Sequence, residues 1–307
     1  MRTESHGAVA AIDCGTNSTR LLIVAPSHPE IRMMRITRLG RGVDATGRLD
    51  DAGVAATLAV LREYRALMDK SGVRRGRLVA TSAVRDAANR EEFVSGAGAA
   101  TGLEVEVLEG SVEGELAFAG ATSQAGVPPG DAVVVDIGGG STEIVTRSPE
   151  LRCVSLDIGC VRLTERLFHH DPALSTELES ARRLVASQLD GARRSLGPMS
   201  EQRTLLGLAG TVSTLGALDQ GLSHYERDRI HHHLLTASSV EHWLGVLASE
   251  PAAQRAQRAS IAPGREDVIV AGVLVLAQVI GVFGFDSCLV SEADLLDGIV
   301  GGLLGRS

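Results

Sequence analysis

Two short segments of the chain carry the same pattern of acidic, glycine and hydroxyl residues. Residues 13–19 read DCGTNST and residues 136–142 read DIGGGST, so both fit D-x-G-x-x-S-T, and each follows an apolar run. Glycines allow backbone N–H groups to approach an anion closely, and successive N–H groups in a tight turn form a concave site for phosphate oxygens. Two such loops that face each other across a cleft would hold a chain of phosphates from both sides.

Each segment begins with an aspartate, at the expected end of the preceding strand. The carboxylates of Asp13 and Asp136 would repel a phosphate group bound in the same loop. A divalent cation between carboxylate and phosphate removes this repulsion, and Mg²⁺ prefers hard oxygen ligands of this kind. The two aspartates therefore predict a divalent cation at the phosphate site.

The elements that must position these loops follow from hydrophobic periodicity. Apolar runs bounded by turn residues predict strands at residues 8–13, 20–25, 31–39, 77–81, 103–108, 132–136, 142–146, 151–157, 205–208 and 288–290. Amphipathic patterns predict helices at residues 50–71, 89–101, 111–124 and 176–196. The order of elements restarts after residues 126–130, which read GVPPG. An α/β chain is predicted, with a first domain at residues 1–126 and a second at residues 127–307.

Composition argues against several classes of protein. Lysine and arginine total 30 residues, of which Lys70 is the only lysine, and no G-x-x-x-x-G-K-[ST] loop of a P-loop NTPase is present. A net charge of −8 argues against a general nucleic-acid binder. The four cysteines form no C-x-x-C pair, which predicts free thiols in a reducing compartment. Because the first residues also lack the pattern of a signal peptide, a cytoplasmic protein is predicted.

Two further segments have competing interpretations. Residues 268–285 form an apolar stretch in which Gln278 is the one polar side chain, and its length meets the lower limit for a membrane span. Internal glycines and the lack of flanking Lys/Arg asymmetry favour a helix buried on all sides instead. His231, His232 and His233 are consecutive, so their side chains point in different directions, and a partly exposed loop is favoured over a metal site.

Several segments occur in an order that resembles a known family. They are residues 11–18 (AIDCGTNS), 80–87 (ATSAVRDA), 109–116 (EGSVEGEL), 136–143 (DIGGGSTE), 208–211 (LAGT) and 291–294 (SEAD). Together they resemble the Ppx/GppA family of exopolyphosphatases and guanosine pentaphosphate phosphohydrolases, over nearly the whole chain. The resemblance implies two ribonuclease-H-like domains of the actin, hexokinase and heat-shock-chaperone ATPase superfamily, with a cleft between them. The last helix could pack back on the first domain.

The resemblance also implies roles for single residues. Glu113 aligns with the catalytic glutamate that activates water as general base, and Arg85 aligns with an arginine that binds phosphate in the cleft. Asp136 and Glu143 match acidic positions implicated in binding Mg²⁺ (or Mn²⁺), and Asp13 is a weaker candidate. The positions that match the phosphate loops are Asn17, Ser18, Gly138, Gly139, Gly140, Ser141, Gly210 and Thr211.

The sequence departs from the family pattern in two ways. Family members often have Glu-Glu-Ala at the catalytic position, whereas this chain has Val112-Glu113-Gly114. Glu115 is only two residues from Glu113, and because a helix places residues two apart on different faces, only one of them can face the cleft. Glu113 is favoured. The chain also resembles the short two-domain members, which lack the extra domains that grip long polyphosphate, and short substrate chains are therefore expected.

The expected activity is hydrolysis of the terminal phosphate of inorganic polyphosphate, with magnesium-assisted in-line attack by water and Glu113 as general base. Two alternatives stay open: a guanosine pentaphosphate 5′-phosphohydrolase, and a polyphosphate- or nucleotide-binding sensor or scaffold without turnover. A kinase of the same fold is disfavoured by the DIGGGSTE stretch and Glu113. A homodimer without nucleic-acid or membrane partners is expected. Arg85, together with Arg20, Arg162 and Arg265, is expected to give the cleft a positive lining inside an acidic protein.

Overall fold

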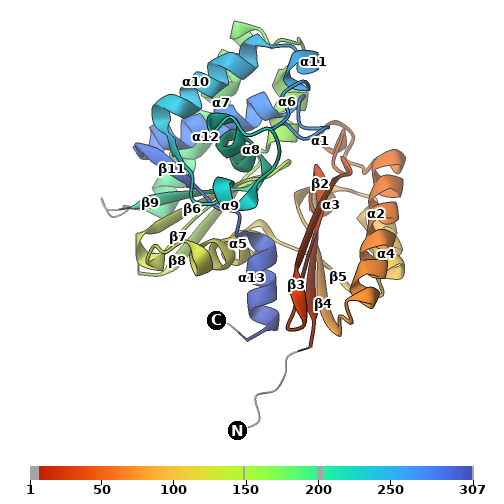
Figure 1. Cartoon of the computed structure of the whole chain (residues 1–307). Helices are drawn as coiled ribbons and strands as arrows, with labels where there is room; N and C mark the ends of the chain where they lie inside the picture. Colours follow the sequence, from red (N-terminus) through yellow and green to blue (C-terminus); the bar gives the residue numbers. More distant parts are fainter. Residues whose placement is uncertain (1–6, 148, 199–202, 306–307) are drawn as a thin grey trace.

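The computed structural model describes residues 7–147, 149–198 and 203–305, and within these residues two β-sheets form (Figure 1). The first sheet has the strand order β3-β2-β1-β4-β5, and the second has the order β10-β11-β9-β6-β7-β8. The strands of the first sheet are β1 (Val9–Cys14), β2 (Ser18–Ala25), β3 (His28–Ile36), β4 (Arg75–Ala80) and β5 (Val105–Val107). Those of the second are β6 (Ala132–Ile137), β7 (Thr142–Arg147), β8 (Leu151–Leu156), β9 (Thr204–Leu208), β10 (Leu234–Thr236) and β11 (Ser287–Val290).

Helices cover both faces of the two sheets (Figure 1). In the first half of the chain they are α1 (Val43–Thr46), α2 (Asp51–Lys70), α3 (Ser82–Asp86), α4 (Arg90–Thr101) and α5 (Gly110–Gln124). A 3-10 turn, η1 (Pro129–Asp131), leads into β6. The second half contains α6 (Cys160–Leu167), α7 (Ser175–Leu196), α8 (Ala209–Asp219), α9 (Arg227–Ile230), α10 (Ala237–Ser249), α11 (Ala252–Arg255), α12 (Ile269–Phe283) and α13 (Leu295–Leu303).

The strand before each glycine loop is buried on both faces, which explains its continuous apolar sequence. In β1, Ile12 joins the core formed with α2 and α4, whereas Ala11 faces the interface between the two sheets. In β6, Val135 packs with α7 and α12, and Val134 faces the same interface as Ala11. Each of these strands pairs antiparallel with the strand after its loop and parallel with a later strand. The two halves therefore present their loops in the same way.

Helices α5 and α13 pack against each other between the sheets (Figure 1). Helix α5 contacts β6, β7 and β8 of the second sheet, whereas α13 contacts β1, β2 and β4 of the first. Their backbones approach closely at glycines: a Cβ on Gly120 would lie 1.9 Å from the carbonyl oxygen of Asp294, and one on Gly298 would lie 2.0 Å from that of Leu116. The two halves thus share one apolar core through this helix pair.

The predicted strands and long helices are confirmed, with shifts of up to three residues at their ends. Helix α12 is the predicted buried helix, and no helix within residues 7–147, 149–198 and 203–305 is long and apolar enough to cross a membrane. The expected histidine loop is also confirmed. His231 Nδ1 accepts a hydrogen bond from the backbone N–H of Glu292, whereas His233 Nε2 bonds to Asp219. The rings of His231 and His232 stack with centroids 3.8 Å apart, so the expectation that all three side chains point in different directions is wrong for this pair. Strand β10 and helix α6 were not anticipated from the sequence.

Candidate active site

The two glycine loops close in the same manner. In the first, the N–H of Gly15 donates to the carbonyl oxygen of Ser18 at 3.0 Å, and in the second the N–H of Gly138 donates to that of Ser141 at 3.0 Å. The sequence repeat is therefore also a repeat of backbone conformation. The loops lie against each other, because a Cβ on Gly139 would be 2.8 Å from Cβ of Thr16. Glycine is needed there for this close approach.

A cavity of about 70 Å³ lies between the two halves, where these loops meet. The expected site residues on its wall are Asp13, Asn17, Ser18, Glu113, Asp136, Gly138, Gly139, Ser141 and Gly210. Four expected residues lie outside this lining. Glu143 is buried, Gly140 lines a smaller neighbouring cavity, the side chain of Thr211 packs against Gly272 of α12, and the Arg85 guanidinium lies 3.7 Å from the carboxylate of Glu113.

Glu113 lies in the first turn of α5 with its side chain directed into the cavity wall. Its carboxylate is buried, whereas Glu115 is exposed, so the helix separates the two acids as expected. Arg85 donates from Nη1 to the carbonyl oxygen of Leu108 at 2.8 Å, and the same atom lies 3.7 Å from Oε2 of Glu113. Arg85 therefore lies beside the carboxylate of Glu113.

The pKa of Glu113 lies well above its usual range. Burial is the largest cause, followed by the negative charges of Glu143, Asp13 and Asp136, and Arg85 opposes the shift. Within the described residues Oε2 of Glu113 has no hydrogen-bond partner. A buried carboxylate with a free oxygen and an elevated pKa can accept a proton from a group in the cavity.

The repeated loops differ in the residue that faces each aspartate. Asp13 lies directly opposite Arg20 in the β1–β2 pair, and Asp136 lies directly opposite Glu143 in the β6–β7 pair. Residues directly opposite each other in an antiparallel pair share one face of the sheet. In the first half Arg20 neutralises the aspartate, with Nη2 at 2.7 Å from Asp13 Oδ2. In the second half two carboxylates face each other, so this strand pair has no positive charge of its own to offset them.

The electrostatics of the acidic pair agree with this description. Burial raises the pKa of Asp136 to about 7, with further repulsion from Asp294 and Asp13, and the Arg20 charge opposes it. Burial and then the Asp136 charge raise the pKa of Glu143 to about 7. Ser155 donates to Oε1 of Glu143 at 2.6 Å, but Oε2 has no partner among the described residues. Two buried carboxylates, one of them with a partnerless oxygen, fit a hard divalent cation.

Asp13 fits a cation less well, because Arg20 occupies its Oδ2 and only Oδ1 has no partner in the described part of the chain. Residues 7–147, 149–198 and 203–305 contain no group of three or more His, Cys, Asp or Glu side chains arranged around one ion. Mg²⁺ often binds through one or two carboxylates, with water and substrate phosphate oxygens as its other ligands. The Asp136–Glu143 pair is compatible with binding of that kind.

Of the four arginines expected in the cleft, Arg20 and Arg265 line the cavity. Besides Asp13, Arg20 binds Asp294, the N-cap residue of α13, with Nη1 at 2.5 Å from Oδ2. The expectation for Arg162 is wrong. Its guanidinium pairs with Asp44 and Asp86 of the first half and donates from Nε to the carbonyl oxygen of Gly140 at 2.8 Å. Through these contacts Arg162 holds the second glycine loop and links the two halves of the chain.

A second cavity of about 620 Å³ adjoins the first and shares Arg20, Gly210 and Arg265 with it. We call it the outer chamber. Its remaining wall is of mixed character, and includes Glu30, Arg32, Met33, Met34, Tyr225, Arg227, Glu292 and Asp294. These residues come from β3, from the segments around α8 and α9, and from the start of α13. Apart from the residues shared with the first cavity, only residues 291–294 belong to a motif segment singled out in the sequence, so most of the outer chamber was not anticipated.

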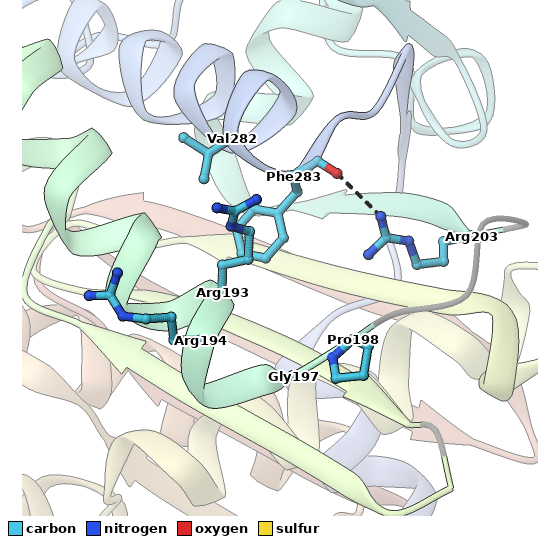
Figure 2. Close-up of a pocket in the computed structure, with 7 residues that line it drawn as sticks. All are labelled: Arg193, Arg194, Gly197, Pro198, Arg203, Val282 and Phe283. Atoms are coloured by element: carbon cyan, nitrogen blue, oxygen red, sulfur yellow. Dashed lines mark hydrogen bonds between the residues drawn. The ribbon is translucent and has the colours of Figure 1, made fainter.

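A further cavity of about 380 Å³ lies at the other end of β9, beside Arg203 (Figure 2). Arg193, Arg194 and Arg203 surround it, and Arg203 donates from Nη2 to the carbonyl oxygen of Phe283 at 3.2 Å. The glycine loops and Gly210 lie at the carboxyl end of β9, whereas Arg203 precedes its first residue. This cavity is therefore separate from the candidate active site.

Comparison with known proteins agrees with the geometry. Residues 23–307 match the sequence model of the Ppx/GppA phosphatase family. The chain is 43% identical to exopolyphosphatase 2 of Mycobacterium tuberculosis, over 97% of this chain and 98% of that protein. The crystal structure of an exopolyphosphatase-like protein superposes with a TM-score of 0.88 at 35% identity, covering 95% of this chain and 97% of that one. That of a Ppx/GppA family member from Aquifex aeolicus gives a TM-score of 0.80 at 34% identity, with 98% of both chains covered. The predicted fold of two ribonuclease-H-like domains is confirmed.

Proposed function

The chain belongs to the Ppx/GppA phosphatase family, and we propose that it hydrolyses the terminal phosphate of inorganic polyphosphate. The predicted class, a hydrolase, is confirmed by the family. The proposal for the substrate depends on one observation above all. Glu113, with an unpartnered oxygen and an elevated pKa, lies on the wall of the cavity that both glycine loops form. A base and two phosphate loops in one small cavity fit water attack on a terminal phosphate.

In the proposed mechanism the terminal phosphate binds between the loops, where backbone N–H groups and the hydroxyl groups of Ser18 and Ser141 surround it. Glu113 accepts a proton from the attacking water at its carboxylate. A general base works best when its pKa lies near the working pH, and burial moves Glu113 in that direction. Arg85, 3.7 Å from Glu113, keeps the carboxylate oriented.

Charge stabilisation is shared among groups of the cavity wall. Positioning and electrostatic stabilisation supply most of the rate in phosphoryl transfer. Arg20 places a positive charge on the cavity wall, and its guanidinium is also bound by the carboxylates of Asp13 and Asp294. Asp136 and Glu143 would hold Mg²⁺ or Mn²⁺, with Oδ1 of Asp13 as a further acceptor. A bound ion of this kind would stabilise negative charge on the transferring phosphoryl group.

A second candidate, a guanosine pentaphosphate 5′-phosphohydrolase, is favoured by the outer chamber. A volume of about 620 Å³ lies within the usual range for organic ligands. Its walls include Tyr225, Met33 and Met34, which can contact a base or ribose, whereas a bare phosphate chain gains little from apolar walls. The chamber therefore leaves room for a nucleoside behind the phosphates.

Parallel initial rates test the proposal. Phosphate release is measured with tripolyphosphate, polyphosphates of graded length, guanosine pentaphosphate and ATP under the same Mg²⁺ concentration. We expect the highest kcat/KM with a short polyphosphate. A higher value with the pentaphosphate, reduced by Tyr225→Ala while the polyphosphate rate is unchanged, would establish the second candidate instead. Binding of polyphosphate without release from any substrate would establish the sensor or scaffold alternative.

A further inference from the structure

The carbonyl groups of the second glycine loop accept hydrogen bonds from the start of helix α6. The backbone N–H of Cys160 donates to the carbonyl oxygen of Gly138 at 2.9 Å. The backbone N–H of Val161 donates to the carbonyl oxygen of Gly139 at 2.8 Å. Backbone groups of α6 therefore hold two consecutive peptides of the loop in one orientation.

The next carbonyl, that of Gly140, is held by a side chain. Nε of Arg162 donates to its oxygen at 2.8 Å, and no backbone N–H in the described part of the chain does so. The guanidinium of Arg162 is fixed in turn by the first half of the chain. Its Nη1 lies 2.9 Å from Oδ1 of Asp44, and its Nη2 pairs with Asp86. One side chain thus connects the orientation of a loop peptide to the contact between the two halves.

The direction of each carbonyl also sets the direction of the N–H group that follows it. In a planar trans peptide the C=O and the next N–H point in opposite directions. The N–H groups of Gly139, Gly140 and Ser141 therefore point away from α6, and within the described residues none of them donates to another backbone group. Gly139 and Ser141 line the small cavity. Successive N–H groups arranged in this way can bind phosphate oxygens.

The first glycine loop is held in a similar manner, but by backbone alone. The carbonyl oxygen of Asn17 accepts from the backbone N–H groups of Thr37 and Arg38, both at 3.0 Å. Asn17 occupies the position of Gly140 in the repeated D-x-G-x-x-S-T segment. At this position of the repeat, Arg162 therefore does with a side chain what backbone N–H groups do in the first loop.

Resting on the proposed function, we propose that Arg162 is a positioning residue, which fixes the peptide between Gly140 and Ser141 so that the N–H of Ser141 faces the bound phosphate. A peptide next to glycine turns over readily, because glycine adopts positive and negative φ with similar ease. The hydrogen bond from Nε prevents this by holding the carbonyl oxygen. The ion pairs with Asp44 and Asp86 keep Nε in place.

Two substitutions at Arg162 separate the bond to the loop from the ion pairs. Glutamine has a donor nitrogen at the same place along the side chain as Nε of arginine, whereas methionine has a similar length and no donor. Both substitutions remove the charge that pairs with Asp44 and Asp86. We expect Arg162→Met to weaken orthophosphate binding by about 10–100-fold, the contribution of a hydrogen bond to a charged group, and Arg162→Gln to recover most of this loss. Calorimetry of the full chain with orthophosphate, at fixed Mg²⁺, gives the dissociation constants.

Arg166→Met is the matched control. Arg166 lies on the same helix and also binds Asp44 across the two halves, and within the described residues its side-chain hydrogen bonds go to that carboxylate alone. This variant therefore loses an ion pair between the halves and keeps the bond from Arg162 to Gly140. It should bind orthophosphate as the unmodified protein does. Thermal unfolding curves establish that each variant is folded.

The outcomes separate this proposal from the proposed function. If the three variants bind orthophosphate in the expected pattern but the unmodified protein releases no phosphate from any polyphosphate, the proposed function fails and the role of Arg162 stands. Undiminished orthophosphate binding by folded Arg162→Met would refute the role of Arg162, and so would an equal loss in Arg162→Gln and Arg162→Met, even where hydrolysis is observed. A loss of the same size in Arg166→Met would assign the effect to the link between the halves and would also overturn the proposal.

Discussion

The contact between α5 and α13 provides a prediction whose size can be worked out from the structure. In Gly120→Ala the new Cβ would lie 1.9 Å from the carbonyl oxygen of Asp294 and 2.8 Å from the backbone nitrogen of Gly298. Both contacts are with backbone, so no rotamer change relieves them. The helices must separate by about 1.5 Å before the closest pair reaches an ordinary van der Waals distance of about 3.4 Å.

The change in the free energy of unfolding caused by Gly120→Ala is the balance of two effects. Overpacking a well-packed core typically costs about 1–3 kcal/mol, and a clash with backbone belongs at the upper end of that range. Replacing glycine by alanine inside a helix stabilises the helix by about 1 kcal/mol. The expected net loss is about 2 kcal/mol, which corresponds to a Tm lower by about 4–8 °C for a chain of this size. Calorimetry or circular dichroism during heating measures it.

The same change at Gly281 should have the opposite sign. Gly281 lies in α12 with its missing Cβ in open space, so Gly281→Ala gains helix propensity without a clash and should raise Tm by about 1–4 °C. Displacing α13 should also lower kcat/KM, because Asp294 at its N-cap binds Arg20. A Tm for Gly120→Ala equal to or above that of the unmodified protein would refute the close packing of α5 on α13.

Three further expectations concern the link between the halves, pH and metal. Asp44→Asn removes the negative charge that pairs with Arg162 and Arg166 across the two halves and should lower Tm, with a difference that shrinks in 1 M salt because salt screens these partly exposed ion pairs; an equal difference at both salt concentrations would contradict this. Burial and the charges of His232 and Arg227 lower the pKa of His231 to about 4, below its unfolded value of about 6.5. The unfolded chain therefore binds more protons between these values, so the free energy of unfolding should fall as pH decreases from 6.5 to 4. The Tm of the His231→Asn protein should fall less over the same range; parallel Tm–pH curves for the two proteins would exclude this role. A chelator should abolish phosphate release, Mg²⁺ should restore it, and Glu143→Gln should raise the Mg²⁺ concentration needed for half-maximal rate; full activity in the chelator would contradict the metal assignment.

The parts of the site that were predictable from the sequence are those encoded locally. The repeated D-x-G-x-x-S-T segments fix both the turn and the strand on either side, so the two loops could be located from spacing alone. Helical geometry separated Glu113 from Glu115, because two residues along a helix change its face. In both cases the information lies within a few consecutive residues.

The parts that were not predictable depend on residues distant in sequence. Arg162 was expected in the cleft but is used by Asp44, 118 residues earlier in the chain. Most of the wall of the outer chamber lies outside the motif segments, because it comes from several separate elements. Tertiary packing decided each of these outcomes.

The most direct test of the proposed mechanism is phosphate release by Glu113→Gln with tripolyphosphate and Mg²⁺, measured beside tripolyphosphate binding. Glutamine keeps the shape of the side chain and removes the base, so binding should persist while kcat falls by about 10²–10⁴-fold, the usual contribution of a general base. Glu115→Gln, on the exposed face of α5, should retain the rate of the unmodified protein. A Glu113→Gln protein that binds tripolyphosphate and turns it over at an undiminished rate would contradict the assignment of Glu113 as the base.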